Sequence, residues 1–99
     1  MGIINRKAGF TQRGFGRIDF VDRYSQSCSI QESSLASERA IWFGVNDAVP
    51  QVLVSGQGWT KVEFPEGTLF STRMHLTQEQ INELLPILQY FADHGELLK

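Results

Sequence analysis

Cysteine is nearly absent from this sequence of 99 residues, because Cys28 is its single representative. One thiol cannot close a disulfide within the chain. The sequence also lacks any run of the roughly 20 apolar residues that a helix needs to cross a bilayer. Its first thirty residues contain no apolar stretch of signal-peptide length. From these absences we expect a cytoplasmic protein with no membrane partner.

Strong catalytic and metal-binding motifs are missing as well. No GxxxxGK[ST], HExxH, CxxC or calcium-loop pattern occurs in the sequence. Gly14-Phe15-Gly16 resembles the start of a dinucleotide-binding loop, but Asp19 occupies the position of the third glycine. The two histidines are too few for a zinc site without further ligands. We therefore expect no metal, no cofactor and no enzymatic activity.

The serine-rich segment from Glu32 to Glu38 offers one catalytic alternative. Ser33, Ser34 or Ser37 would act as nucleophile, with His75 as base and Glu32 or Glu38 orienting it. The segment has no strained GxSxG turn, so the pattern favours a surface loop. The hydrolase hypothesis requires the serine and histidine to lie within roughly 3 Å of each other.

Composition indicates one folded domain rather than a disordered chain. Hydrophobic residues make up 41% of the sequence and charged residues 20%, with a formal net charge of −2. The charge is unevenly distributed, because residues 1–17 carry four basic side chains and no acidic one. Residues 63–99, in contrast, carry six acidic and two basic side chains. One end of the chain is therefore basic and the other acidic.

Alternation of apolar and polar residues predicts short antiparallel strands. They are expected over 17–22, 27–31, 40–45, 51–54, 59–64 and 69–75. In the third of these, Ile41, Phe43 and Val45 share one face, which leaves Trp42 on the other. Residues 1–14 are expected to form a flexible basic arm or a short edge strand, and residues 15–99 a single domain.

A helix is predicted to begin after Thr77, because Thr77 and Gln80 form a capping box, flanked by Leu76 and Ile81 at the positions of a hydrophobic staple. Apolar residues at three- and four-residue spacing give the helix one hydrophobic stripe. The stripe consists of Ile81, Leu84, Leu85, Leu88, Phe91 and Ala92.

The predicted helix ends at Gly95, which suits a left-handed cap. Pro86 should kink the helix and let it wrap around the sheet. We expect an α+β fold in which an antiparallel sheet of four to six strands is covered on one face by a single C-terminal α-helix.

The second face of such a sheet has no predicted cover. Trp42, Trp59 and Tyr24 are then either exposed, as at many partner surfaces, or buried by curling of the sheet. If the strands pair in sequence, one set of side chains shares the helix-free face. This set is Arg17, Ser29, Gln31, Trp42, Arg73 and His75.

The basic segment suggests an alternative partner. Arg13 and Arg17 lie close to Phe15, and Arg6 and Lys7 close to Phe10, so the segment could follow a phosphate backbone and stack on bases. Four cations give weak, salt-dependent binding, and docking onto an acidic protein fits the same residues.

Four short motifs follow one another along the chain, namely Phe20-x-Asp22-x-Tyr24, Cys28-Ser29-Ile30-Gln31-Glu32-Ser33-Ser34, Ile41-Trp42-x-Gly44 and Arg73-Met74-His75-Leu76-Thr77-x-x-Gln80. Together they resemble a group of small, mostly uncharacterised proteins encoded in bacteriophage and prophage genomes. The resemblance covers most of residues 15–95 and implies a phage protein that acts in the host cytoplasm. It implies no catalytic residues.

Together these features lead us to expect a non-enzymatic, phage-type accessory protein that binds and blocks a host protein or ribonucleoprotein complex, such as a CRISPR effector. A small nucleic-acid-binding protein is the alternative, and a homodimer is compatible with both. The residues expected to contact the partner are Arg13, Arg17, Tyr24, Gln31, Glu32, Trp42, Trp59, Arg73 and His75.

Overall fold

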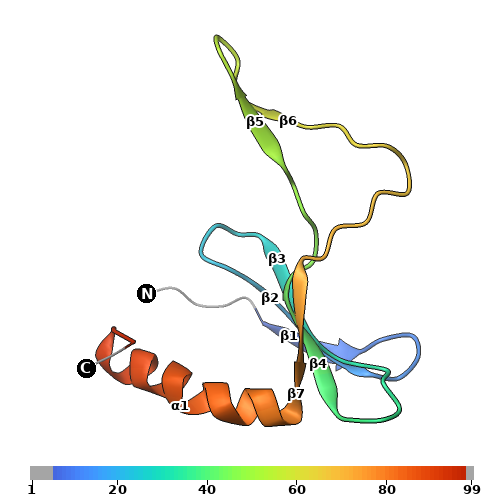
Figure 1. Ribbon diagram of the computed structural model, residues 1–99, viewed down its shortest axis with the longest axis vertical. Coiled ribbons are helices and arrows are strands. Elements are labelled where there is room, and N and C mark those ends of the chain that lie inside the picture. The colour runs from blue at the N-terminus through green and yellow to red at the C-terminus, as the bar shows by residue number, and fades with distance from the viewer. Residues whose placement is uncertain (1–5, 98–99) are drawn as a thin grey trace.

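A computed structural model describes residues 6–97 of the chain (Figure 1). The strands are β1 (Lys7–Phe10), β2 (Gly16–Val21), β3 (Ser27–Glu32), β4 (Ala40–Val45), β5 (Gln51–Val54), β6 (Gly58–Lys61) and β7 (Arg73–Thr77), and the helix is α1 (Gln78–His94). Five strands form one antiparallel sheet in the order β1-β2-β3-β4-β7, and β5 pairs with β6 alone. The predicted α+β class, with a sheet of four to six strands and a single C-terminal helix, is confirmed.

Two strands differ from the prediction by more than one residue at a boundary. The strand expected over 59–64 ends at Lys61, shortly before the turn at Pro65. The strand expected over 69–75 instead covers Arg73–Thr77. Its pairing with β4 starts at Gly44 and Arg73, and β4 ends one residue later, so the residues before Arg73 have no strand to pair with. Residues 7–10 form the edge strand that was one of the two expectations for the N-terminal segment.

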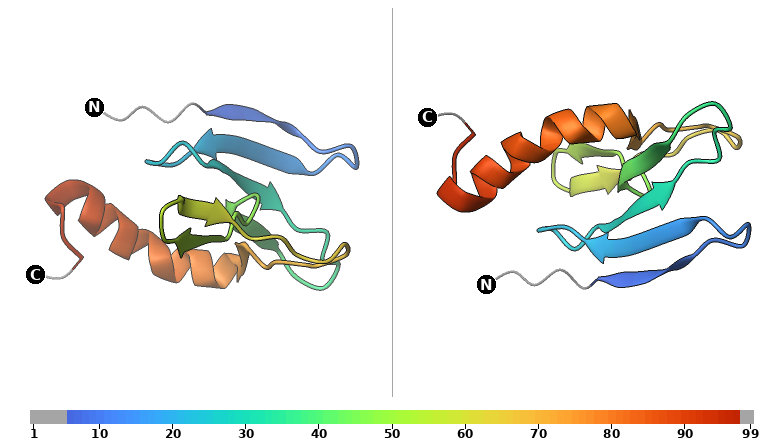
Figure 2. Two further views of the ribbon diagram at one scale, coloured as in Figure 1. Left: turned by 90° about the horizontal axis from the view of Figure 1, so that it is seen from above. Right: turned by 90° about the horizontal axis from the view of Figure 1, so that it is seen from below.

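The helix begins and ends as predicted. The Thr77 Oγ1 accepts the Gln80 N–H at 3.1 Å, and the Gln80 Oε1 accepts the Thr77 N–H at 3.0 Å. Gly95 adopts the left-handed conformation at φ 77°, and its N–H donates to the Phe91 carbonyl. The helix continues through Pro86 but does not wrap around the sheet, since none of its residues is buried. Figures 1 and 2 show it projecting from the end of β7, which is its main packing partner.

The register separates the side chains of the five-stranded sheet into two faces. One row of directly opposed residues runs Ala8-Ile18-Ile30-Phe43-Met74, and the adjacent row runs Phe20-Cys28-Val45. We call these two rows the apolar face. On the opposite side lie Arg17, Asp19, Ser29, Gln31, Trp42, Arg73 and His75, which we call the polar face. The predictions that Trp42 lies opposite Phe43 and that six named residues share a face are confirmed.

Little of the chain is fully buried. Among residues 6–97, Cys28 is the only buried hydrophobic residue and Ser29 the only buried polar one. The β5–β6 hairpin stands away from the main sheet in Figure 1, and its Leu53 and Trp59 side chains, which are cross-strand neighbours, are both exposed. The radius of gyration is 16.9 Å, whereas a compact domain of this length has about 13 Å. The structure is therefore open and extended.

Within residues 6–97, the structure contains no helix with the length and apolar character needed to span a membrane.

Candidate functional site

The polar face carries a continuous set of side-chain contacts across three strands. Gln31 lies at its centre, and its Oε1 accepts from the guanidinium of Arg17 at 3.0 Å and from that of Arg73 at 3.4 Å. Arg17 also forms an ion pair with Asp19, at 2.9 Å between Nε and Oδ1. One neutral amide oxygen thus holds two cations side by side, which gives this part of the sheet a positive potential.

Gly44 explains how Arg73 reaches the centre of the sheet. The register runs Ser29-Gly44-Arg73, so the strand between Arg73 and Ser29 contributes no side chain at this position. The Arg73 side chain crosses this gap, and its Nη1 lies 3.4 Å from the Ser29 Oγ. Ser29 is fully buried and donates to the Asn46 Oδ1 at 2.6 Å. Sequence reasoning missed Gly44 and Asn46, because their roles depend on strand pairing.

Trp42 and His75 extend the polar face as a stacked pair. They are directly opposed on β4 and β7, with ring centroids 3.9 Å apart and planes inclined by 9°. Trp42 is half-buried and His75 exposed, so the stack presents its outer surface to solvent. A flat aromatic platform beside two guanidinium groups is a combination common in partner-binding surfaces.

A shallow depression of about 330 Å³ lies beside this stack, lined in part by Arg13, Arg17, Gln31 and Trp42. Arg13 comes from the turn between β1 and β2, where its guanidinium lies 5.6 Å from the centre of the Phe15 ring. Five of the nine residues expected to contact a partner therefore line this depression.

Glu32 lines the same depression but belongs to the opposite face, because it follows Gln31 on β3. Its carboxylate accepts the backbone N–H of Gly16 and so joins the ends of two neighbouring strands. Tyr24 and Trp59 are exposed elsewhere, in the β2–β3 turn and on the separate β5–β6 hairpin. The structure does not bring these three residues into the polar face.

Ser33 and His75 meet the distance that the hydrolase hypothesis requires. The Ser33 Oγ lies 2.9 Å from the His75 Nε2. The same Oγ accepts the Leu35 N–H at 3.2 Å, within the surface loop. In the described part of the chain, no carboxylate is hydrogen-bonded to the His75 ring. The pair therefore lacks the third group that fixes the imidazole in a catalytic triad.

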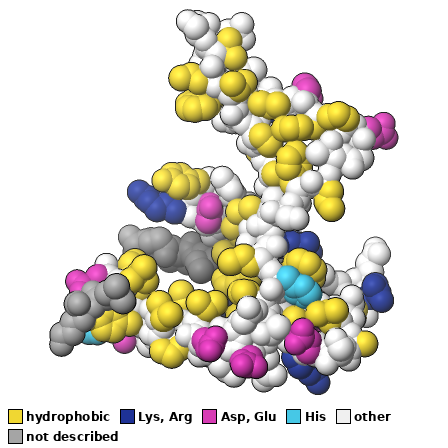
Figure 3. Space-filling view, viewed as in Figure 1, with side chains coloured by type: hydrophobic (Ala, Val, Ile, Leu, Met, Phe, Trp, Pro, Cys, Tyr) yellow, Lys and Arg dark blue, Asp and Glu magenta, His cyan; other side chains and the backbone are white. Residues whose placement is uncertain are grey.

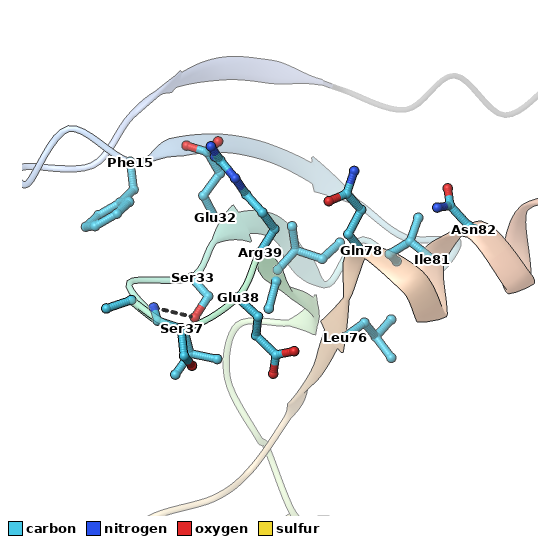
Figure 4. A pocket seen from close by; sticks show the side chains of 14 residues that line it. Phe15, Glu32, Ser33, Ser37, Glu38, Arg39, Leu76, Gln78, Ile81 and Asn82 are labelled. Carbon is cyan, nitrogen blue, oxygen red and sulfur yellow. Dashed lines mark hydrogen bonds between the residues drawn. The ribbon is translucent and has the colours of Figure 1, made fainter.

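A larger cleft of about 860 Å³ lies at one end of the sheet, between the 33–39 loop and the start of α1 (Figure 4). Its apolar lining includes Ile41, Leu76 and Ile81, and polar side chains from the loop face it from the other side. Ile41 and Leu76 are directly opposed on β4 and β7, and Ile81 comes from the first turns of α1.

Two further observations concern metals and thiol chemistry. Residues 6–97 contain no group of three or more His, Cys, Asp or Glu side chains arranged to hold a metal ion. Cys28 is buried on the apolar face, and this burial raises the pKa of its thiol, with a smaller contribution from the nearby Asp22 carboxylate. The thiol thus stays protonated at neutral pH.

Comparison of the chain with protein-family models, with curated proteins and with solved structures finds no match.

Proposed function

We propose that this chain is a non-enzymatic binding protein whose polar face holds an acidic surface of a protein or ribonucleoprotein partner. The observation that carries the proposal is the arrangement of Arg17 and Arg73 on Gln31, next to the Trp42–His75 stack. Arginine and tryptophan dominate the energetics of many protein interfaces.

The charges of the polar face favour an anionic partner. Asp19 already pairs with Arg17, whereas the recorded side-chain acceptors of Arg73 are the neutral Ser29 and Gln31. A carboxylate of a partner gives Arg73 a charged acceptor, and charge-assisted hydrogen bonds are shorter and stronger than neutral ones. The proposed partner therefore carries acidic side chains that reach the Arg73 guanidinium, where it lies over Ser29 and Gln31 of β3.

Binding alone is enough to block a larger complex. Small phage accessory proteins without enzymatic motifs often act by binding and blocking a host complex, and the resemblance in the four sequence motifs led us to expect such a role. Once bound, this chain would occupy the acidic surface of its partner and block the contacts that the partner makes through that surface. A host defence complex is the target class that this proposal favours.

The experiment is capture from bacterial lysate on immobilised chain, with the bound proteins identified by mass spectrometry. We expect a specific partner that is retained by Trp59→Ala but lost with Trp42→Ala and with Arg73→Met. Trp59→Ala is the matched control, because it removes the same type of side chain, exposed on the separate β5–β6 hairpin. Retention of the partner by both polar-face variants would contradict the proposal.

Nucleic acid is a second candidate partner, supported by the depression that Arg13, Arg17 and Trp42 line. Two arginines, of which Arg17 is already paired with Asp19, predict weak binding that declines steeply with salt. Gel retardation of single-stranded and double-stranded oligonucleotides at low salt tests it. Absence of retardation at low salt would leave the protein partner as the only candidate.

A further inference from the structure

The chain exposes far more surface than a monomer of its mass. Its accessible surface is 8650 Å², whereas a folded monomer of 11.2 kDa exposes about 5700 Å². The excess is therefore about 3000 Å². Hydrophobic side chains gather along α1 and on the β5–β6 hairpin in the space-filling view (Figure 3). If two chains each bury half of the excess on the other, the interface totals about 3000 Å², within the range of obligate dimers.

The chain cannot cover its own apolar face with its helix. Thr77 is both the last residue of β7 and the N-cap of α1, so no residue separates the strand from the helix. Helices that fold back on their own sheet normally follow a connection of 2 to about 6 residues. The capping box fixes the direction in which α1 leaves β7, and the helix projects beyond the sheet (Figure 2).

The apolar stripe of α1 becomes more exposed along the helix. Ile81 and Leu84 are half-buried near β7, where Ile81 lines the cleft. Further along, Leu85, Leu88 and Phe91 are 54%, 52% and 51% exposed. On the sheet, Ile18 and Met74 of the apolar row are 36% and 56% exposed. Two unpartnered apolar surfaces thus diverge from one cleft.

These two surfaces match in size. A helix of 17 residues is about 25 Å long, and five paired strands measure about 19 Å from the first to the last. One helix is therefore long enough to lie across a whole sheet.

From this match in length and from the excess exposed surface we infer that a second copy of this chain covers the apolar face, with α1 of each copy lying across the sheet of the other. The arrangement is twofold symmetric, because each chain gives one helix and receives one. It buries the row Ile18-Ile30-Phe43-Met74 beneath the partner copy's Leu85, Leu88 and Phe91. The polar face lies on the other side of the sheet and stays free for the proposed partner.

A second copy of this chain is a better candidate than a different protein to cover the apolar face, because the single chain lacks a hydrophobic core. Cys28 is the single buried hydrophobic residue of the described chain, and so little burial does not offset the conformational entropy of folding. The cover must therefore be present whenever the protein is folded. Only another copy of the same chain meets that condition without depending on the supply of a second protein.

The first experiment measures the mass of the full chain by sedimentation and light scattering across micromolar concentrations. We expect twice the 11.2 kDa of one chain. Leu88→Lys should halve this mass or unfold the chain, whereas Gln89→Lys should keep it, because position 89 lies outside the stripe and its lysine can pair with Asp93. A wild-type mass of one chain, or a doubled mass that survives Leu88→Lys, would overturn the inference.

The second experiment distinguishes exchange of helices from folding back onto the same sheet. A chain carrying Ile18→Cys together with Leu88→Cys is oxidised and examined on a non-reducing gel. We expect a band of two linked chains, which neither single variant produces at the same yield. An intrachain disulfide in a band of one chain would show that the helix covers its own sheet and would contradict the inference.

This inference does not depend on the proposed function. Trp42→Ala and Arg73→Met lie on the polar face and should leave the doubled mass unchanged while removing partner capture. Loss of capture with an intact dimer would identify the polar face as the binding surface, and a monomeric wild type that still captures its partner would refute the dimer alone.

Discussion

The two faces of the five-stranded sheet differ in how far contacts within one chain satisfy their side chains. On the polar face, every contact is made within the chain: Gln31 holds two arginines, Ser29 bonds to Asn46, and Trp42 stacks on His75. On the apolar face, Phe20 and Phe43 meet edge to face at 6.4 Å, but both are only half-buried, and Met74 beside Phe43 is exposed. One face is complete in a single chain and the other is not.

The difference shows which kind of interaction each face is suited to. Hydrogen-bonded side chains on the polar face stay fixed while the surface remains wet, so a partner can come and go. The apolar face gains free energy only when water leaves it, so its cover is expected to be permanent. The sheet thus offers a permanent contact on its apolar face and an exchangeable one on its polar face.

The largest expected effect on stability comes from Phe43→Ala, which is compared with the same truncation of Trp42 on the opposite face. Phe43→Ala should lower the free energy of unfolding by about 3 kcal/mol, the loss typical of a covered phenylalanine. Trp42→Ala should lower it by only about 1 kcal/mol, because the stack with His75 is the main contact removed. Urea denaturation of the two variants measures both values.

Equal decreases in the free energy of unfolding for Phe43→Ala and Trp42→Ala would contradict the proposed difference between the two faces. A small loss for Phe43→Ala would mean that the apolar face is open in solution, as it is in the single chain. A large loss for Trp42→Ala would place this ring in the core and remove it from the binding surface.

Gly44→Ala should have the next largest effect, roughly 2 kcal/mol of stability. Gly44 has φ 151°, and a Cβ at this position would lie 2.8 Å from the Thr72 carbonyl oxygen and 3.0 Å from the Arg73 Cα. Both contacts are with backbone, so β4 and β7 would have to separate. Gly9→Ala on β1 is the control, since its Cβ meets nothing within 4 Å. Thermal unfolding should separate the two variants by several degrees, and similar melting temperatures would contradict the strain argument.

The sequence predicts those features that depend only on residues close together along the chain. The capping box of Thr77 and Gln80 is local, and alternation places Trp42 opposite Phe43, so both are predictable. The role of Gly44 requires the register of three strands, of which β7 begins 29 residues later. The exposure of α1 depends on the absence of a connection after Thr77, and the predicted helix cover did not take that into account.

Arg73→Met should lower stability by about 1 kcal/mol, because it removes the two long hydrogen bonds to Ser29 and Gln31 while keeping the aliphatic stem over Gly44. Ser29 keeps its bond to Asn46, so no buried hydroxyl is left without a partner. Urea denaturation measures the change. A loss of 3 kcal/mol or more would indicate that Arg73 supports the fold and would weaken its assignment to partner binding.

Alkaline pH should reveal the burial of Cys28. Its pKa is raised in the folded chain, so the unfolded chain loses the thiol proton first, above a pH of about 8.5. The stabilising contribution is complete below that pH and is lost as the pH rises toward the folded pKa. Denaturation at a series of pH values should show a decline in wild type that is shallower in Cys28→Ala. Identical pH profiles would mean that the thiol is not buried in solution.

The smallest expected effect concerns the Ser33–His75 pair, where we expect no reaction with a fluorophosphonate probe. The Ser33 Oγ lies 2.9 Å from the His75 Nε2, which is suitable for proton transfer. It also accepts the Leu35 N–H, and no carboxylate among residues 6–97 is bonded to the imidazole. An unoriented imidazole on an exposed surface gives the hydroxyl little activation. Labelling of Ser33 that Ser33→Ala or His75→Gln abolishes would turn the polar face from a binding surface into a reactive one, and mass spectrometry of the treated chain decides between the two.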